Sequence, residues 1–113
     1  MRYFVSIGGA SGIIYGIRLI QELNKMNHEV HLVVSEAAKK ILQHETSYTQ
    51  TILKTQASVV YDNDDLFAGP ASGSFPLDGM IVIPCSMKTL SSIAHGFGDT
   101  LTSRAASCCL KEG

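Results

Sequence analysis

The chain has 113 residues, of which 45% are hydrophobic and 17% are charged, and its formal net charge is −1. This composition is typical of one folded domain and excludes an intrinsically disordered chain. The near-neutral charge gives no electrostatic basis for binding nucleic acid or an anionic membrane surface. Because the sequence has no apolar run of about 18 residues, no transmembrane helix is expected.

The cysteines and histidines indicate neither disulfides nor a metal. Of the three cysteines, Cys108 and Cys109 are adjacent, so a disulfide framework is not predicted. The four histidines and the cysteines do not have the spacing of metal ligands, and no metal site is expected. Together with the lack of an apolar leader at the start, this cysteine content favours a reducing cytoplasm.

The first half of the chain alternates strand and helix patterns. Residues 3–7 predict a buried strand, and residues 12–26 predict an amphipathic helix because apolar side chains recur at helical spacing. A second strand is predicted over residues 29–34. Ser35 then stands where it can cap a short helix that ends near Gln43.

The middle of the chain has weaker signals. Residues 47–50 resemble a capping box for a helix that ends near Lys54. Residues 57–61 predict a third strand, and residues 62–77 are expected to be a loop, acidic at first and rich in glycine, proline and serine later.

The last part returns to clear signals. Residues 80–83 form a short, continuous apolar run, which is typical of a strand buried on both faces. A helix is predicted from about Met87 to His95. Asp99 stands where it can cap a last helix that runs to about Lys111.

This alternation predicts one α/β domain over residues 1–113, with a Rossmann-like or flavodoxin-like parallel sheet and helices on both faces. Ligands of such sheets bind at the carboxyl ends of the strands. Three predicted strand ends carry candidate ligand-binding residues: 8–12, Ser35 and 85–89. We expect these segments to converge.

The glycine-serine turn at residues 8–12 joins the first strand to the first helix. Such a turn exposes backbone N–H groups beside the positive end of a helix dipole, which suits a phosphate. The turn is neither a G-x-G-x-x-G fingerprint nor a phosphate-binding loop ending in Gly-Lys-Ser/Thr, so dinucleotide binding and P-loop hydrolysis lose support. A plain tight connection is the other interpretation.

Other candidate residues also have a purely structural interpretation. Ser35 and the segment 86–89 can cap helices or contact a ligand, and the two roles are compatible. Arg104 and Lys111 lie seven residues apart and therefore on one helix face, where they can bind two anions or simply face solvent. Cys85 is either a nucleophile or a structural thiol, and no histidine partner can be assigned to it.

Several segments together resemble the UbiX-like flavin prenyltransferases, with the right order and spacing over nearly the whole chain. They are Gly9-Ala10-Ser11-Gly12 with Tyr15-Gly16, Val34-Ser35, Ala71-Ser72-Gly73-Ser74-Phe75, Pro84-Cys85-Ser86-Met87-Lys88-Thr89, and Arg104-Ala105-Ala106 with Leu110-Lys111-Glu112. The resemblance implies noncovalent FMN binding and transfer of a dimethylallyl group from dimethylallyl phosphate to reduced FMN. The prenylated FMN would then serve a UbiD-type decarboxylase.

The resemblance also implies roles for particular residues. The FMN-binding positions that it implies are Gly9, Ala10, Ser11, Ser35, Ser86, Met87, Lys88, Thr89 and Arg104. Lys111 corresponds to a lysine that helps to hold the prenyl phosphate, and Glu45 corresponds to an acidic residue near the reacting centre.

The family continues beyond a Leu-Lys-Glu segment with an Arg-Glu-Thr-Pro strand and further phosphate-binding residues, so the chain is expected to be shortened at its C-terminus. Family members form trimers and dodecamers, and a homo-oligomer is expected. Three alternatives remain: a noncatalytic FMN-binding or assembly subunit of an aromatic-acid decarboxylase, an FMN-dependent cysteine decarboxylase, and a flavodoxin-like electron carrier. The segment at residues 84–89 differs from the Pro-x-Ser-Ala-Asn-Thr pattern of the cysteine decarboxylases.

Overall fold

A parallel sheet organises the computed structural model, which describes residues 1–112. Its strand order in these residues is β3-β2-β1-β4. β1 (Arg2–Ile7) pairs with β2 (Glu29–Val34) on one side and with β4 (Gly79–Val82) on the other. β3 (Val59–Tyr61) pairs with the outer side of β2. The predicted α/β class with a flavodoxin-like parallel sheet is confirmed.

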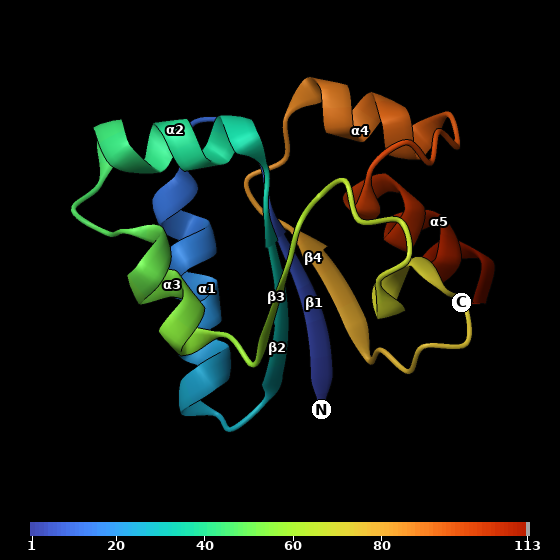
Figure 1. Ribbon diagram of the computed structural model, residues 1–113, viewed down its shortest axis with the longest axis horizontal. Helices are drawn as coiled ribbons and strands as arrows, with labels where there is room; N and C mark the ends of the chain where they lie inside the picture. Colours follow the sequence, from blue (N-terminus) through green and yellow to red (C-terminus); the bar gives the residue numbers. More distant parts are fainter. Residues whose placement is uncertain (113) are drawn as a thin grey trace.

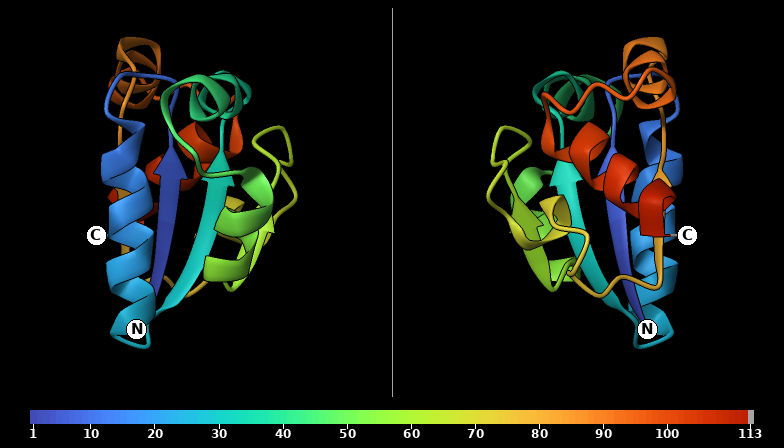
Figure 2. Two further views of the ribbon diagram at one scale, coloured as in Figure 1. Left: turned by 90° about the vertical axis from the view of Figure 1, so that its left-hand side faces the viewer. Right: turned by 90° about the vertical axis from the view of Figure 1, so that its right-hand side faces the viewer.

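Helices cover both faces of this sheet (Figure 1). α1 (Ile13–Lys25) and α3 (Gln50–Gln56) lie on one face. α5 (Leu101–Glu112) lies on the other face, beside the short 3₁₀ turn η1 (Gly69–Ala71) (Figure 2). Among residues 1–112, no helix has the length and apolar character needed to cross a membrane.

The two remaining helices lie at one end of the sheet. α2 (Glu36–Glu45) and α4 (Met87–Ala94) lie across the end toward which the strand arrows point (Figure 1). Each follows directly from the carboxyl end of a strand, α2 from β2 and α4 from β4. Their N-termini therefore lie near the end of β1, where the glycine turn begins.

A hydrophobic core packs against each face of the sheet, because successive side chains of a strand point to opposite faces. Val5 of β1 belongs to the core under α1, together with Ile17 and Leu32. Phe4 belongs to the core under α5, together with Leu101. All of these side chains are fully buried.

The structure corrects two predicted helix caps. α3 is capped by Thr49, whose side chain accepts a hydrogen bond from the Ile52 N–H, and not by Ser47. α5 begins after Thr100, whose Oγ1 accepts a hydrogen bond from the Ser103 N–H at 3.2 Å, whereas Asp99 is exposed. In both cases the hydroxyl nearest to the first helical residue becomes the cap.

Candidate active site

The three predicted strand ends meet in one cleft at the carboxyl end of the sheet. The cleft encloses about 240 Å³. Gly9 comes to it from the end of β1, Ser35 from the end of β2, and Ser86, Lys88 and Thr89 from the start of α4. The expected convergence of these segments is therefore present.

The glycine turn packs closely against the segment after β4 and against the start of α2. The Gly8 N–H donates to the Pro84 carbonyl at 3.0 Å, which ties the turn to the segment after β4. A side chain on Gly9 would place its Cβ 2.4 Å from the Ala37 Cβ, so only glycine allows α2 to begin at this position. Gly12 has φ 89°, a left-handed conformation that turns the chain into α1.

Two serines cap the helices that border the cleft. The Ser35 Oγ accepts a hydrogen bond from the Ala38 N–H at 3.1 Å, and the Ser86 Oγ accepts one from the Thr89 N–H at 3.1 Å. Ser86 also donates its own hydroxyl hydrogen to Thr89 Oγ1 at 3.0 Å. The hydroxyl hydrogens of Ser35 and Thr89 are thus left to donate to a ligand.

The cleft contains further polar residues that the sequence did not indicate. Asn63, from the loop after β3, lines it, as do Ser92 of α4, Asp99 and Thr100 just before α5, and Ser103 in the first turn of α5. Asn63 was missed because it lies in a segment predicted only as an acidic loop. Its contact with α5 spans 39 positions and leaves no local signal.

Other predicted site residues lie near the cleft or away from it. Ala10 and Ser11 are in the glycine turn, and Met87 is an exposed residue of α4, but none of the three lines the cleft. Three further predicted residues belong to α2 and α5. Glu45, Arg104 and Lys111 are exposed and do not line the cleft, so their roles stay predictions.

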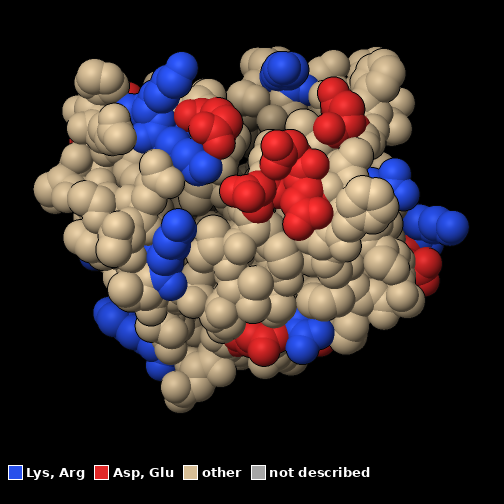
Figure 3. Space-filling model, viewed as in Figure 1, with Lys and Arg blue, Asp and Glu red and all other residues tan. Residues whose placement is uncertain are grey.

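One positive and one negative side chain line the cleft, and the loop after β3 that contributes to it is acidic. Lys88 and Asp99, both exposed, are the charged residues that line it within the described chain. Acidic side chains also gather near the middle of the face shown in Figure 3, and the loop after β3 supplies Asp62, Asp64 and Asp65. The hydrogen bond from Lys39 to Glu36 raises the pKa of Lys39. The negative charges of Asp62 and Asp64 raise this pKa to a lesser extent.

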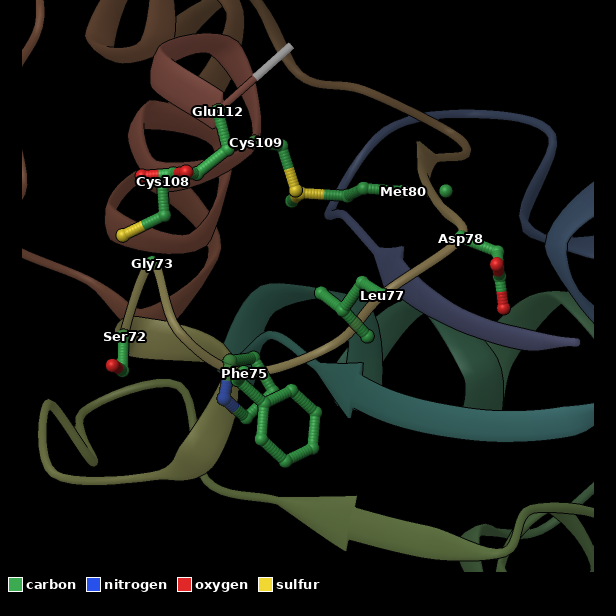
Figure 4. A pocket seen from close by; sticks show the side chains of 11 residues that line it. Ser72, Gly73, Phe75, Leu77, Asp78, Met80, Cys108, Cys109 and Glu112 are labelled. Atoms are coloured by element: carbon green, nitrogen blue, oxygen red, sulfur yellow. The ribbon is translucent and has the colours of Figure 1, made fainter.

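A second cavity of about 230 Å³ lies between the C-terminal part of α5 and the segment before β4 (Figure 4). Cys108 donates its thiol hydrogen to the Ala71 carbonyl at 3.3 Å. Burial, with a contribution from Cys108, raises the pKa of the Cys109 thiol. The described residues hold no group of three His, Cys, Asp or Glu side chains placed to bind a metal. The carboxyl-end cleft, where the three predicted strand-end segments meet, is the better candidate site.

The parallel sheet, the glycine turn and the hydroxyl-rich cleft define an α/β protein of the flavodoxin-like class with a ligand site at the carboxyl ends of its strands. The family model described as Flavoprotein matches residues 1–113. The chain therefore belongs to the flavoprotein family.

Curated relatives confirm the resemblance to flavin prenyltransferases. Flavin prenyltransferase UbiX of Archaeoglobus fulgidus is 51% identical over 112 residues, which make up 99% of this chain and 62% of that protein. Flavin prenyltransferase LpdB of Lactiplantibacillus plantarum is 49% identical over 112 residues, or 98% of this chain and 60% of that protein. The chain thus spans about three fifths of the length of the curated relatives it matches.

Solved structures agree with this assignment. AnUbiX in complex with FMN and dimethylallyl pyrophosphate has a TM-score of 0.96 and 44% identity, covering 98% of this chain and 59% of that one. A dodecameric FMN-dependent Ubix-like decarboxylase from Escherichia coli O157:H7 has a TM-score of 0.97 and 46% identity, covering 100% of this chain and 62% of that one. DmrB of Burkholderia xenovorans, at 19% identity and a TM-score of 0.77, shares the fold.

Proposed function

We propose that the carboxyl-end cleft binds FMN and that the protein serves in flavin prenyl transfer, from dimethylallyl phosphate to reduced FMN. The cleft itself carries this proposal, because it joins a glycine turn, two serine-capped helix N-termini and a row of hydroxyl groups. Relatives named flavin prenyltransferases at 46–51% identity support it. So does the similar structure that holds FMN and dimethylallyl pyrophosphate.

The residues that line the cleft suit the phosphate and ribityl part of FMN. Six of the eleven are serine or threonine. A phosphate has only acceptor oxygens, and the cleft offers donors to it: the free hydroxyl hydrogens of Ser35 and Thr89 and the ammonium group of Lys88. The positive ends of the α2 and α4 dipoles add to this preference.

Reduced FMN, when bound, supplies the nucleophilic N5 and C6 positions that accept the prenyl group. The chain's own part is to hold the nucleotide and to stabilise the phosphate anion that leaves, since a prenyl monophosphate needs a stabilised leaving group. We propose Lys111 as the cation for that anion, Arg104 as a further contact to FMN and Glu45 as an acidic group near the reacting centre. Their support is the sequence resemblance.

A noncatalytic FMN-binding or assembly subunit is the second candidate. It is favoured by one observation: Glu45, Arg104 and Lys111 lie outside the cleft in the described chain. This arrangement is expected of a protein that binds FMN in the cleft but lacks a prenyl-phosphate site.

An anaerobic turnover assay separates these candidates. The purified protein is incubated with reduced FMN and dimethylallyl phosphate, and the flavin is analysed by mass spectrometry. We expect a flavin heavier by the mass of one prenyl group. Bound but unmodified FMN would contradict prenyl transfer and favour the noncatalytic subunit, whereas a lack of FMN binding would contradict both.

Three further parts of the proposal concern partners and location. A UbiD-type decarboxylase would receive the prenylated FMN. The protein would assemble as a homo-oligomer, a trimer or a dodecamer, and the E. coli O157:H7 structure described as dodecameric supports this. The location proposed for this reaction is the cytoplasm.

A further inference from the structure

Asn63 is anchored to the first turn of α5 from the edge of the cleft. The Thr102 N–H donates to Asn63 Oδ1 at 3.1 Å, and Thr102 Oγ1 donates to the same oxygen at 2.9 Å. The Leu101 N–H donates to the Asn63 main-chain carbonyl at 2.7 Å. These three hydrogen bonds hold Asn63 in a fixed position in an otherwise irregular loop.

A buried hydroxyl chain fixes which way the Asn63 amide faces. Thr102 Oγ1 lies 2.7 Å from Ser6 Oγ in β1, and the two residues are only 4% and 3% exposed. Thr102 gives its hydroxyl hydrogen to Asn63, so Ser6 must give its own hydrogen to Thr102. A reversed amide would set the Asn63 NH₂ against the Thr102 N–H, two donors facing each other. The oxygen therefore faces α5, and Nδ2 faces the other way.

Asn63 lines the same cleft as Ser35, Lys88 and Thr89. In residues 1–112, its Nδ2 has no protein acceptor, whereas its Oδ1 has two donors. Two N–H donors of this cleft-lining amide are thus left without a protein acceptor, while its oxygen is already engaged. It adds a neutral donor to a group of donors that already suits an anion.

We infer that the Asn63 Nδ2 donates a hydrogen bond to an acceptor oxygen of the bound flavin nucleotide, and that Thr102 and Ser6 position this amide. The inference rests on the proposed binding of FMN. The acceptor is either a phosphate oxygen or an oxygen of the ribityl chain or ring, since both have the chemistry that an amide N–H recognises. Asn63 is thus a binding residue, and Thr102 and Ser6 act through it.

The substitution Asn63→Asp tests this inference without disturbing the anchor. Aspartate has the same shape, and its inner oxygen still accepts both hydrogen bonds from Thr102, but an anionic oxygen replaces the NH₂ group. We expect an equal or higher melting temperature, because a carboxylate favours a helix N-terminus. We expect FMN affinity, measured by flavin fluorescence quenching, to fall about tenfold or more. Asn24→Asp, at an exposed position of α1, is the matched control and should bind FMN like the wild type.

Titration of both proteins with riboflavin, which lacks the phosphate, shows which oxygen of the nucleotide accepts the hydrogen bond from Asn63. Weaker binding of FMN alone assigns the amide to the phosphate, and equally weaker binding of FMN and riboflavin assigns it to the ribityl chain or ring; each supports the inference. If wild type and Asn63→Asp bind FMN equally, the inference is wrong while the proposed FMN site stands. If the folded wild-type protein binds no FMN, the proposed function fails, and this inference fails with it.

The positioning role of Thr102 has a separate test. Thr102→Val removes one of the two anchors of the amide oxygen and should weaken FMN binding by about threefold, less than the direct change at Asn63. Thr102→Ser keeps the hydroxyl and should restore the affinity. A Thr102→Ser variant that binds FMN as weakly as Thr102→Val would contradict this role, because both would then act through packing alone.

Discussion

The Thr89 hydroxyl has an unusual position among the polar groups of the cleft. It accepts a hydrogen bond from Ser86, whose Oγ in turn accepts one from the Thr89 N–H. This reciprocal pair uses the hydroxyl hydrogen of Ser86 and leaves that of Thr89 without a protein acceptor in the described residues. The Thr89 hydroxyl in the first turn of α4 thus keeps a hydrogen for a ligand, while Ser86 caps the helix.

Thr89→Val should therefore affect binding more than folding. Valine keeps the shape but removes the hydroxyl, and we expect FMN affinity to fall about tenfold in a fluorescence titration, as for loss of a hydrogen bond to a charged group. Thr55→Val is the control, because Thr55 is also a helical threonine but lies on α3, where its hydroxyl donates to the Ile52 main-chain carbonyl. Equal FMN affinity in wild type and Thr89→Val would exclude Thr89 as a contact.

At the scale of elements, the cleft depends on how closely α2 approaches the glycine turn. The Cβ that Gly9 lacks would lie 2.4 Å from the Ala37 Cβ and 3.3 Å from the Ala38 main-chain nitrogen. Neither atom belongs to a flexible side chain. The start of α2, including its cap Ser35, is therefore set by the absence of a side chain at residue 9.

Gly9→Ala should push the N-terminus of α2 away from the turn. We expect a loss of about 1–3 kcal/mol in the free energy of unfolding, as for other overpacked sites, together with weaker FMN binding. Chemical denaturation measures the first effect. Gly98→Ala is the control, since the nearest atom to its added Cβ is 4.0 Å away. If Gly9→Ala is as stable as Gly98→Ala, the close approach of α2 does not determine the cleft.

The elements also show what sequence patterns can and cannot predict. The strand over residues 29–34 and the meeting of Gly9, Ser35 and Ser86 follow from local apolar patterns and from the geometry of parallel sheets. Asn63 was not predicted, because its role depends on a contact with Thr102 that only the folded chain creates. The cap of α5 is Thr100 and not the predicted Asp99, because contacts in the folded chain can shift a helix boundary by one or two residues.

At the scale of the whole molecule, the two ends of the sheet differ. The carboxyl end holds the cleft, while the amino end holds a polar network on the α5 side. Glu29 accepts hydrogen bonds from His31 Nε2, at 2.9 Å, and from Arg2 Nε. The buried His31 also bonds through Nδ1 to the Tyr61 hydroxyl at 2.8 Å. This network joins β1, β2 and β3 away from the carboxyl-end cleft.

The amino-end network predicts a sensitivity to acid. The hydrogen bonds from His31, and then from Arg2, lower the pKa of Glu29 below its ordinary value of 4.5. A lowered pKa stabilises the fold above that ordinary value, and the stabilisation is lost as the pH falls through the lowered pKa. The advantage of wild type over Glu29→Gln in unfolding free energy should thus shrink as the pH falls from about 6 to about 3. Glu45→Gln, an exposed site at the end of α2, is the control. A pH-independent advantage would contradict this account.

The central claim is that the carboxyl-end cleft is a flavin nucleotide site, and an FMN titration of the purified, folded protein tests it most directly. Quenching of flavin fluorescence should saturate at one FMN per chain. Riboflavin should bind more weakly, because it lacks the phosphate that the donors of the cleft favour. A folded protein that leaves flavin fluorescence unchanged at all FMN concentrations tested would contradict the claim.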